Sequence, residues 1–213
     1  MHRMIQQVTI EAEYTDGMCR AERLCKRLFD VVGAFIGLIL LSPIFLVIMV
    51  ILWIQGDGVF YRQERVGYKG RIFNIFKFRT MNRDAEKDGV PRLVNLDDEH
   101  LTKFGTCLRA HHLDELPQLV NILKGDMSFV GPRPERKYFV DKILQENNDY
   151  VYIYRMTPGT TSLATLFNGY TDTMEKMLIR LQMDLDYYQK RSLWMDLKIM
   201  LLTLKYLLFG KKF

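Results

Sequence analysis

Two adjacent carboxylates, Asp114 and Glu115, stand at the start of a short helical pattern over residues 113–125. Its apolar side chains recur at spacings of three and four residues: Leu116, Leu119, Val120 and Leu123. Pro117 is tolerated only in the first turn of a helix, which places the carboxylate pair at the helix N-terminus. There the helix dipole, with Arg109 five residues upstream, would lower the carboxylate pKa and keep the pair ionised, as a nucleophile or metal ligand must be. The alternative is that the pair only caps the helix.

A second unusual motif is Gly131-Pro132-Arg133-Pro134. Each proline fixes its own φ and forces an extended backbone on the residue before it, so Arg133 has little backbone entropy left to lose. A planar guanidinium held in this way suits bidentate contact with phosphate oxygens. The alternative is a surface turn with a solvated arginine.

A third cationic site lies in residues 76–79, Phe-Lys-Phe-Arg, within a predicted β-hairpin over residues 59–81. The strand period places both rings on one face and the cations Lys77 and Arg79 on the other. An ordinary solvated face is the alternative reading. Cations for phosphates beside an ionised carboxylate pair are the parts that a phosphoryl-type transfer with Mg²⁺ needs.

The elements that hold these residues include an apolar segment, residues 31–54, with no charged side chain and enough length to cross a bilayer. Ser42 and Pro43 lie at its middle, where proline removes a helix hydrogen bond, and each half alone is too short to span. Basic residues, which favour the cytoplasmic side, flank both ends. They are Arg20, Arg23, Lys26 and Arg27 on one side and Arg62, Arg65, Lys69 and Arg71 on the other. A re-entrant hairpin bent at Ser42 and Pro43 satisfies both ends; a kinked single span and a buried core helix are the alternatives.

The C-terminus carries a second membrane signal. Residues 193–213 have apolar side chains at helical spacing, and Lys211 and Lys212 close the segment. An amphipathic helix of this kind can lie in the membrane interface, although an ordinary core-facing helix is the alternative. Further helices are predicted over about 135–146 and 172–189, and an exposed loop over 82–99.

Composition narrows the class of protein. A chain of 213 residues with 48% hydrophobic residues is neither disordered nor repetitive. The net charge of +5 favours partners that carry phosphate, and three cysteines and four histidines show no zinc-ligand spacing. The predicted fold is α+β and predominantly helical, with a small β-hairpin and amphipathic interfacial helices. A loosely held arm over 1–19 precedes a re-entrant membrane helix over 20–56 and a cytoplasmic catalytic domain over 57–213.

Six motifs follow one another in a specific order. They are Lys26-Arg27-Leu-Phe-Asp30, Ser42-Pro43, Phe76-Lys-Phe-Arg-Thr-Met81, Leu113-Asp-Glu-Leu-Pro-Gln118, Lys124-Gly-Asp-Met-Ser-Phe-Val-Gly-Pro-Arg-Pro134 and Pro158-Gly159. This set resembles the bacterial sugar transferase family, the monotopic polyprenyl-phosphate phosphoglycosyl transferases of glycoconjugate biosynthesis. The likeness covers about residues 24–210, and the chain resembles the minimal, catalytic-domain form of the family.

The resemblance implies a reaction at the cytoplasmic face of a bacterial inner membrane. A sugar 1-phosphate passes from a UDP-sugar to undecaprenyl phosphate, and UMP is released. By this likeness Asp114 is the nucleophile, which forms a covalent phosphosugar intermediate, and Glu115 helps it to hold Mg²⁺. Four cations are then candidates for binding the diphosphate and the lipid phosphate: Lys77, Arg79, Arg109 and Arg133. Ser42 and Pro43 would bend the membrane helix, and Pro132 and Pro134 would stiffen the arginine loop.

The chain departs from the family pattern in three places. His111 and His112 precede the Leu-Asp-Glu motif where small hydroxyl residues are more frequent, residues 160–165 read Thr-Thr-Ser-Leu-Ala-Thr, and Tyr170 stands in place of a basic residue. A catalytically silent membrane scaffold for glycosyltransferases is the main rival function. Nucleic acid is not expected as a partner because no nucleic-acid-binding signature is present. Membrane lipid is an expected partner, and a homodimer stays open.

Overall fold

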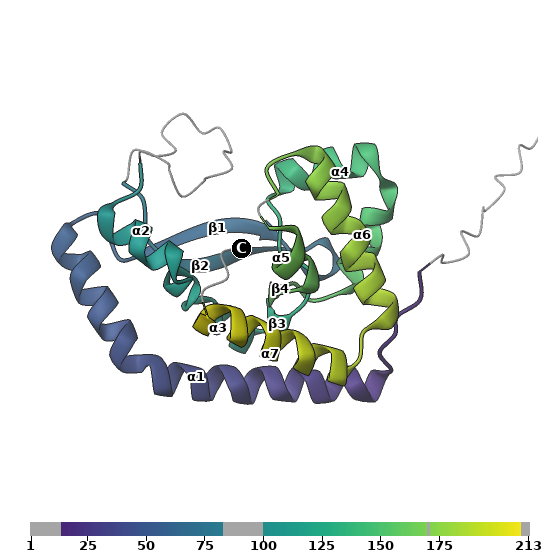
Figure 1. Cartoon of the computed structure of the whole chain (residues 1–213), viewed down its shortest axis with the longest axis horizontal. Helices are drawn as coiled ribbons and strands as arrows, with labels where there is room; N and C mark the ends of the chain where they lie inside the picture. Colours follow the sequence, from purple (N-terminus) through teal and green to yellow (C-terminus); the bar gives the residue numbers. More distant parts are fainter. Residues whose placement is uncertain (1–13, 83–99, 170, 210–213) are drawn as a thin grey trace, which may run out of the picture.

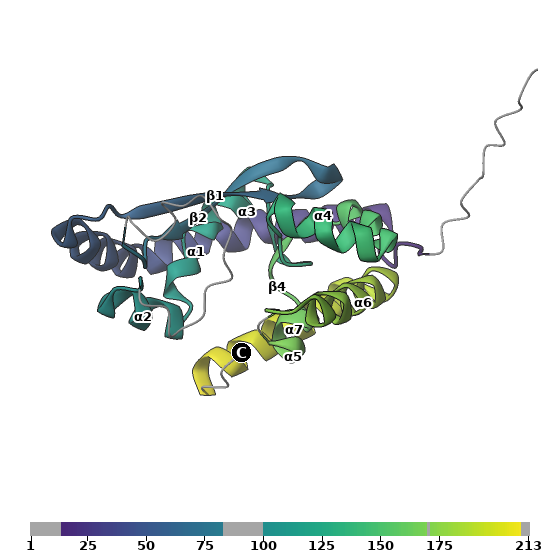
Figure 2. The same ribbon diagram turned by 90° about the horizontal axis from the view of Figure 1, so that it is seen from above.

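The computed structural model describes residues 14–82, 100–169 and 171–209. Most of these residues are helical, with a small β-hairpin, as predicted. A second pair of very short strands was not predicted. The predicted loop over 82–99 and the calls on Tyr170, Lys211 and Lys212 fall wholly or almost wholly outside the described residues. Figures 1 and 2 show a long bent helix, α1, running along one side of a mixed domain.

The helix α1 (Arg20–Gln55) is continuous over 36 residues and begins with a reciprocal cap. The Cys19 backbone N–H donates to the Glu22 carboxylate at 3.0 Å, and the Cys19 sulfur accepts from the Glu22 backbone N–H. At its end, Gly56 takes a φ of 84°, a left-handed conformation that glycine adopts without steric strain.

The predicted break at the middle of α1 is a bend within one helix. Pro43 has no N–H and cannot donate to the carbonyl oxygen four residues earlier, that of Ile39. The Ser42 hydroxyl donates to this same oxygen at 2.7 Å, so Ser42 satisfies the acceptor that Pro43 leaves without its helix partner. Figure 1 shows two arms that meet at an angle. A re-entrant path through a membrane stays a prediction.

Replacing Pro43 by Ala should straighten α1, because alanine restores an N–H donor to the Ile39 carbonyl and removes the ring clash. A straight helix rises about 1.5 Å per residue, so labels at Cys25 and at an Ile54→Cys variant would then lie about 44 Å apart. In the bent helix the two labels lie closer together. Pulsed electron paramagnetic resonance on the detergent-solubilised protein measures this distance directly.

The labelled background should carry Cys19→Ser and Cys107→Ser, because all three native cysteines are exposed and serine keeps a capping side chain at position 19. Ser42→Ala is the matched control, since it keeps Pro43 and should keep the shorter distance. An unchanged distance in Pro43→Ala would contradict this account of the bend.

Most apolar side chains of α1 lie on its outer surface. A narrow inward stripe is buried and includes Ala34, Ile48 and Leu52, whereas Leu40 and Trp53 are 72% and 75% exposed. Within the described ranges, α1 is the one helix long and apolar enough to cross a membrane. A core helix of a soluble protein would cover these side chains, so the exposed surface disfavours that alternative and supports membrane association.

The predicted hairpin is present. Strand β1 (Phe60–Val66) pairs antiparallel with β2 (Ile72–Phe78), with Phe60 opposite Phe78 and Val66 opposite Ile72. A short 3-10 turn, η1 (Tyr68–Gly70), connects them. Phe78 is buried, and its neighbours along β2 are Lys77 and the Arg79 that follows the strand.

The remaining elements follow in chain order. They are α2 (Lys103–Ala110), η2 (Leu113–Glu115), α3 (Gln118–Lys124), β3 (Ser128–Val130), α4 (Lys137–Glu146), η3 (Asn148–Arg155), β4 (Gly159–Thr161), α5 (Leu163–Asn168), α6 (Met174–Lys190) and α7 (Leu193–Phe209). The helices predicted over 135–146 and 172–189 are confirmed as α4 and α6, with small shifts at their ends. The elements α2, η3 and α5 were not predicted.

The predicted continuous helix over residues 113–125 is wrong. Residues Leu113–Glu115 form the 3-10 turn η2, and α3 begins only at Gln118, with Pro117 as its N-cap residue. Because Pro117 has no N–H, the Leu113 carbonyl cannot receive an α-helical hydrogen bond from it. The Leu116 N–H donates to that carbonyl instead, at 3.3 Å. The carboxylate pair therefore lies on a tight turn and not at a helix N-terminus.

Two glycines bring the arginine loop close to the segment before α5. The short strands β3 and β4 are parallel, and the Gly159 N–H donates to the Pro132 carbonyl at 2.9 Å. A Cβ atom on Gly131 would lie 2.4 Å from the Thr157 carbonyl oxygen, and one on Gly159 would lie 2.1 Å from the Gly131 nitrogen. Any side chain at either position would force the two segments apart and displace Arg133.

The chain before α1 is anchored where the structure describes it. Arg191 donates to both carboxylate oxygens of Asp16, at 2.7 and 2.6 Å, and the Gly17 N–H donates to the Tyr188 carbonyl. The loosely held arm predicted over 1–19 is therefore wrong for residues 14–19, and residues 1–13 lie outside the described part.

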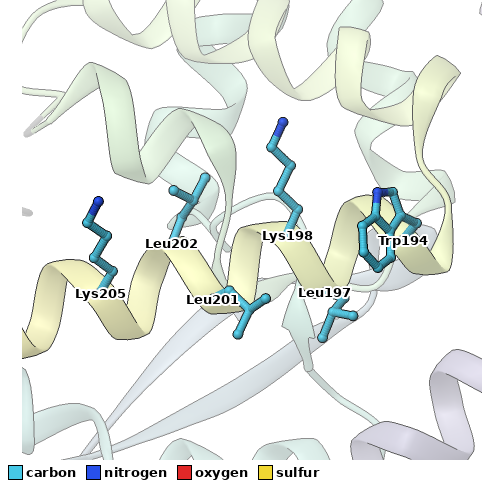
Figure 3. Close-up of a pocket in the computed structure, with 6 residues that line it drawn as sticks. All are labelled: Trp194, Leu197, Lys198, Leu201, Leu202 and Lys205. Atoms are coloured by element: carbon cyan, nitrogen blue, oxygen red, sulfur yellow. The ribbon is translucent and has the colours of Figure 1, made fainter.

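The C-terminal helix α7 has two different sides. Asp196 and Ile199 are buried against the domain, whereas Trp194, Leu201 and Leu204 are exposed. A hollow of about 240 Å³ lies along the helix. Figure 3 shows Lys198 and Lys205 pointing to one side of α7 and Leu197 and Leu201 pointing to the other. The hollow is lined by Trp194, Leu197, Lys198, Leu201, Leu202 and Lys205. The helix thus faces the core on one side, and membrane contact by its exposed side stays a prediction.

Candidate active site

The carboxylate pair is presented by a tight turn between two helices. His112, directly before η2, has a φ of 54° and ψ of 20°, which is the left-handed region that few residues other than glycine adopt. The chain reverses here after α2, and the carboxylate pair follows two and three residues later. Asp114 is 5% exposed, and Glu115 is half-buried beside it. His111 is exposed, and its ring contacts the Cys107 carbonyl.

Two separate segments bring a cation to Glu115. The Lys77 ammonium of β2 lies 2.6 Å from Glu115 Oε1, and Arg133 Nη2 lies 3.0 Å from the same oxygen. The strand β2 contacts both η2 and α3, and α3 in turn packs against α1. The predicted grouping of Lys77, Arg133 and the carboxylate pair is therefore present.

The pKa values of the two carboxyl groups are shifted in opposite directions. Burial alone would raise the pKa of Glu115, but the Lys77 and Arg133 charges outweigh burial and hold this pKa well below its usual range. Burial raises the pKa of Asp114, and the Glu115 charge adds to the rise against the opposing charges of Lys77 and Arg109. The predicted lowering by a helix dipole is therefore wrong for Asp114. Its direction is right for Glu115, although two side-chain cations cause it.

The other two predicted cations take different positions. Arg109 Nε donates to the Thr80 hydroxyl at 3.0 Å, and its charge acts on Asp114. Arg79 donates to the Phe60 carbonyl at 3.4 Å and lies over the Tyr61 ring, 5.9 Å from its centroid. Arg109 thus borders the site, whereas the observed contacts of Arg79 are on β1.

Asp114 and Glu115 fit a Mg²⁺ ion whose remaining ligands are substrate phosphates and water. No group of three or more metal-binding side chains occurs among the residues that the structure describes. Mg²⁺ is usually held by one or two carboxylates together with substrate phosphates and water, and Asp114 with the second oxygen of Glu115 offers such a pair. The contacts of Lys77 and Arg133 with Glu115 are both made to Oε1.

Two buried residues of α3 near the site were not singled out from the sequence. Asn121 accepts from the Phe76 N–H at 2.9 Å and donates to the Asn74 carbonyl at 2.7 Å, so it joins α3 to the edge of β2 beside Lys77. Gln118 is 2% exposed, and its amide nitrogen has no hydrogen-bond partner within the described ranges. Gln118 closes the Leu-Asp-Glu-Leu-Pro-Gln motif, which was the one available signal for it.

The departure at residues 160–165 has a structural role. The Thr160 hydroxyl donates to the Phe129 carbonyl at 2.9 Å, and the Thr161 and Thr203 hydroxyls lie 2.7 Å apart, which joins β4 to α7. Ser162 caps α5 through the Thr165 N–H. These hydroxyls therefore support the segment that packs against the arginine loop.

Comparison with known proteins gives a consistent result. A sequence model of the family described as bacterial sugar transferase matches residues 21–210. The UDP-N-acetylgalactosamine-undecaprenyl-phosphate N-acetylgalactosaminephosphotransferase of Aeromonas hydrophila is 37% identical over 186 residues, which are 87% of this chain and 44% of that protein.

Two further relatives bear the name UDP-glucose:undecaprenyl-phosphate glucose-1-phosphate transferase. The one from Escherichia coli (strain K12) is 38% identical over 193 residues, covering 89% of this chain and 41% of that protein. The one from Caulobacter vibrioides is 40% identical over 188 residues, covering 87% of this chain and 70% of that protein. The chain thus spans less than half the length of two of these three curated relatives.

Proposed function

This chain belongs to the bacterial sugar transferase family, and we propose that it transfers a sugar 1-phosphate from a UDP-sugar to undecaprenyl phosphate. The observation that carries the proposal is the convergence of Lys77 and Arg133 on Glu115 beside the buried Asp114. Phosphoryl transfer depends on positioning and on neutralising charge, and this arrangement supplies both together with an oxygen nucleophile.

In the first half-reaction, a carboxylate oxygen of Asp114 attacks the phosphorus that carries the sugar. A bond forms between this oxygen and phosphorus, the bridging P–O bond of the diphosphate breaks, and UMP leaves with the bridging oxygen. Burial removes the water shell of the Asp114 carboxylate, which makes its ionised form a stronger nucleophile, and the Lys77 and Arg109 charges favour that ionised form.

In the second half-reaction, a phosphate oxygen of undecaprenyl phosphate attacks the same phosphorus. The bond to Asp114 breaks, which restores the carboxylate and gives the undecaprenyl diphosphate sugar. Lys77 and Arg133 contact Glu115 in the free protein, and we expect them to share their charge with donor phosphate oxygens when the donor binds. We expect Arg109, whose charge acts on Asp114, to stabilise the charge on the lipid phosphate.

A Mg²⁺ ion at Asp114 and Glu115 would neutralise the charge that develops on the leaving UMP. The position of the site also suits a lipid acceptor, because β2 and α3 pack on the inner face of α1, whose outer face is apolar and exposed. We infer that α1 enters the inner membrane from the cytoplasmic side and holds the site at the headgroups.

The test is release of UMP by the purified protein in nanodiscs with Mg²⁺, undecaprenyl phosphate and a panel of UDP-sugars. The panel should include UDP-glucose and UDP-N-acetylgalactosamine, because relatives of similar identity are named for both sugars. Release that requires the lipid phosphate supports the transferase and identifies its donor. Folded protein that releases no UMP from any donor would overturn the proposal and favour a scaffold.

A further inference from the structure

The loop that carries Arg133 continues into a buried cluster of charges that no step of the proposed reaction uses. Glu135 and Arg180 are 7% and 8% exposed, and Arg180 Nη2 lies 2.6 Å from Glu135 Oε1. On the opposite side, Arg65 Nη1 lies 3.7 Å from Glu135 Oε2. Glu135 is therefore held between α6, which carries Arg180, and β1, which carries Arg65.

The backbone around Glu135 is tied to the same strand. The Val66 N–H donates to the Glu135 carbonyl at 2.9 Å, and Arg65 donates to the Pro134 carbonyl at 3.0 Å. Because the residues on both sides of Arg133 are prolines, few backbone torsions remain free in this loop. Fixing residues 134 and 135 therefore fixes the direction in which the Arg133 side chain leaves the main chain.

Stability alone is a weak explanation for this cluster. Removing two charges from water costs several kcal/mol per ion, and a buried ion pair can often be replaced by apolar residues without loss of stability. The cluster also borders Arg133 directly, since Arg133, Glu135 and Arg180 line one small cavity of about 10 Å³. The Glu135 charge, after that of Glu115, helps to raise the pKa of Arg133.

We propose that Glu135, held by Arg180 of α6 and Arg65 of β1, is a positioning residue that aims the Arg133 guanidinium at Glu115 and at a bound phosphate. The Glu135 carboxylate fixes the end of the proline-bounded loop. The Arg133 side chain then samples few rotamers other than the one that contacts Glu115 or a bound phosphate. The positioning of Arg133 is inferred from these contacts alone, whereas its effect on turnover rests on the proposed function.

A double-substitution cycle separates positioning from general stabilisation. Glu135→Gln should lower kcat/KM for the UDP-sugar by between ~10- and ~100-fold, because a small displacement of a phosphate-binding group has effects of this size. In an Arg133→Lys background, the same Glu135→Gln change should cost less than about 3-fold, since the group that it positions is already gone. A purely structural role would give the same loss in both backgrounds and would overturn the proposal.

A readout without substrate keeps the inference independent of the reaction. The order parameter of the Arg133 Nε–H group, measured by NMR, should fall from a rigid value in the parent to below about 0.6 in Glu135→Gln. Arg133→Lys, which removes this signal, assigns it. An unchanged order parameter would overturn the proposal even if turnover fell, whereas absent turnover with a lowered order parameter would reject only the proposed function.

Asp141→Asn is the matched control, because it removes the carboxylate of an exposed ion pair with Lys137 on the neighbouring helix α4. It should change neither kcat/KM nor the order parameter. If Glu135→Gln fails to fold, Glu135→Asp keeps the charge and shortens the side chain by one methylene group. It should then give a smaller loss in the same two measurements, and no loss would overturn the proposal.

Discussion

Replacement of Asp114 by Asn is expected to lower UMP release on the order of 10⁴-fold or more, because the amide cannot act as the oxygen nucleophile. The fold should be kept. Asn has the shape of Asp, and the site is one where burial raises the carboxyl pKa and so disfavours the charged form. The melting temperature in detergent should therefore stay the same or rise by a few degrees.

Two further variants calibrate this loss. Glu115→Gln should lower turnover less than Asp114→Asn, because it weakens the ion pairs with Lys77 and Arg133 but leaves the nucleophile in place. Asp141→Asn, on the exposed face of α4, should have no effect. More than about one hundredth of the parent rate in Asp114→Asn, with no deamidation seen by mass spectrometry, would refute the assigned nucleophile.

Part of the grouping of charged side chains was predictable from the sequence. The proline-bounded Arg133, the strand residue Lys77 and the carboxylate pair were each singled out by type and spacing, and Lys77 and Arg133 do converge on Glu115. The bend at Ser42 and Pro43 was predictable for a similar reason, because proline acts on its own helix turn. Such local effects need no knowledge of distant contacts.

Properties set by distant contacts were not predictable. The pKa of Asp114 rises because tertiary packing buries it, and no spacing rule reports burial at a turn. Arg79 looked equivalent to Lys77 by strand period, yet its observed contacts lie on β1. Arg180 is 45 positions from Glu135 in the chain, so their ion pair appears only when α6 folds back over the arginine loop.

Asp184 lines the same small cavity as Glu135 and Arg180. Its carboxyl group predicts a strong dependence of stability on pH. Burial raises the pKa of this carboxyl to about 7, against the charge of Arg180 and with that of Glu135. The Asp184 charge in turn adds to the raised pKa of Tyr150 and of Tyr187. Asp184 Oδ1 has no hydrogen-bond partner within the described chain. An unfolded chain releases this proton near pH 3.8, so between about pH 4 and 7 only the folded protein keeps it. The free energy of unfolding should therefore fall as pH rises through this window, by on the order of 4 kcal/mol.

Asp184→Asn removes the buried charge at every pH and should reverse this loss. We expect the variant to exceed the parent in melting temperature at pH 8.5 and to match it near pH 4.5, measured in the same detergent. Asp186→Asn is the matched control on the exposed side of α6 and should shift neither value. An equal shift at both pH values would contradict the buried titration. The variant keeps the ion pair between Arg180 and Glu135, so turnover should not fall. This result would differ from the loss of turnover expected when Glu135 itself is altered.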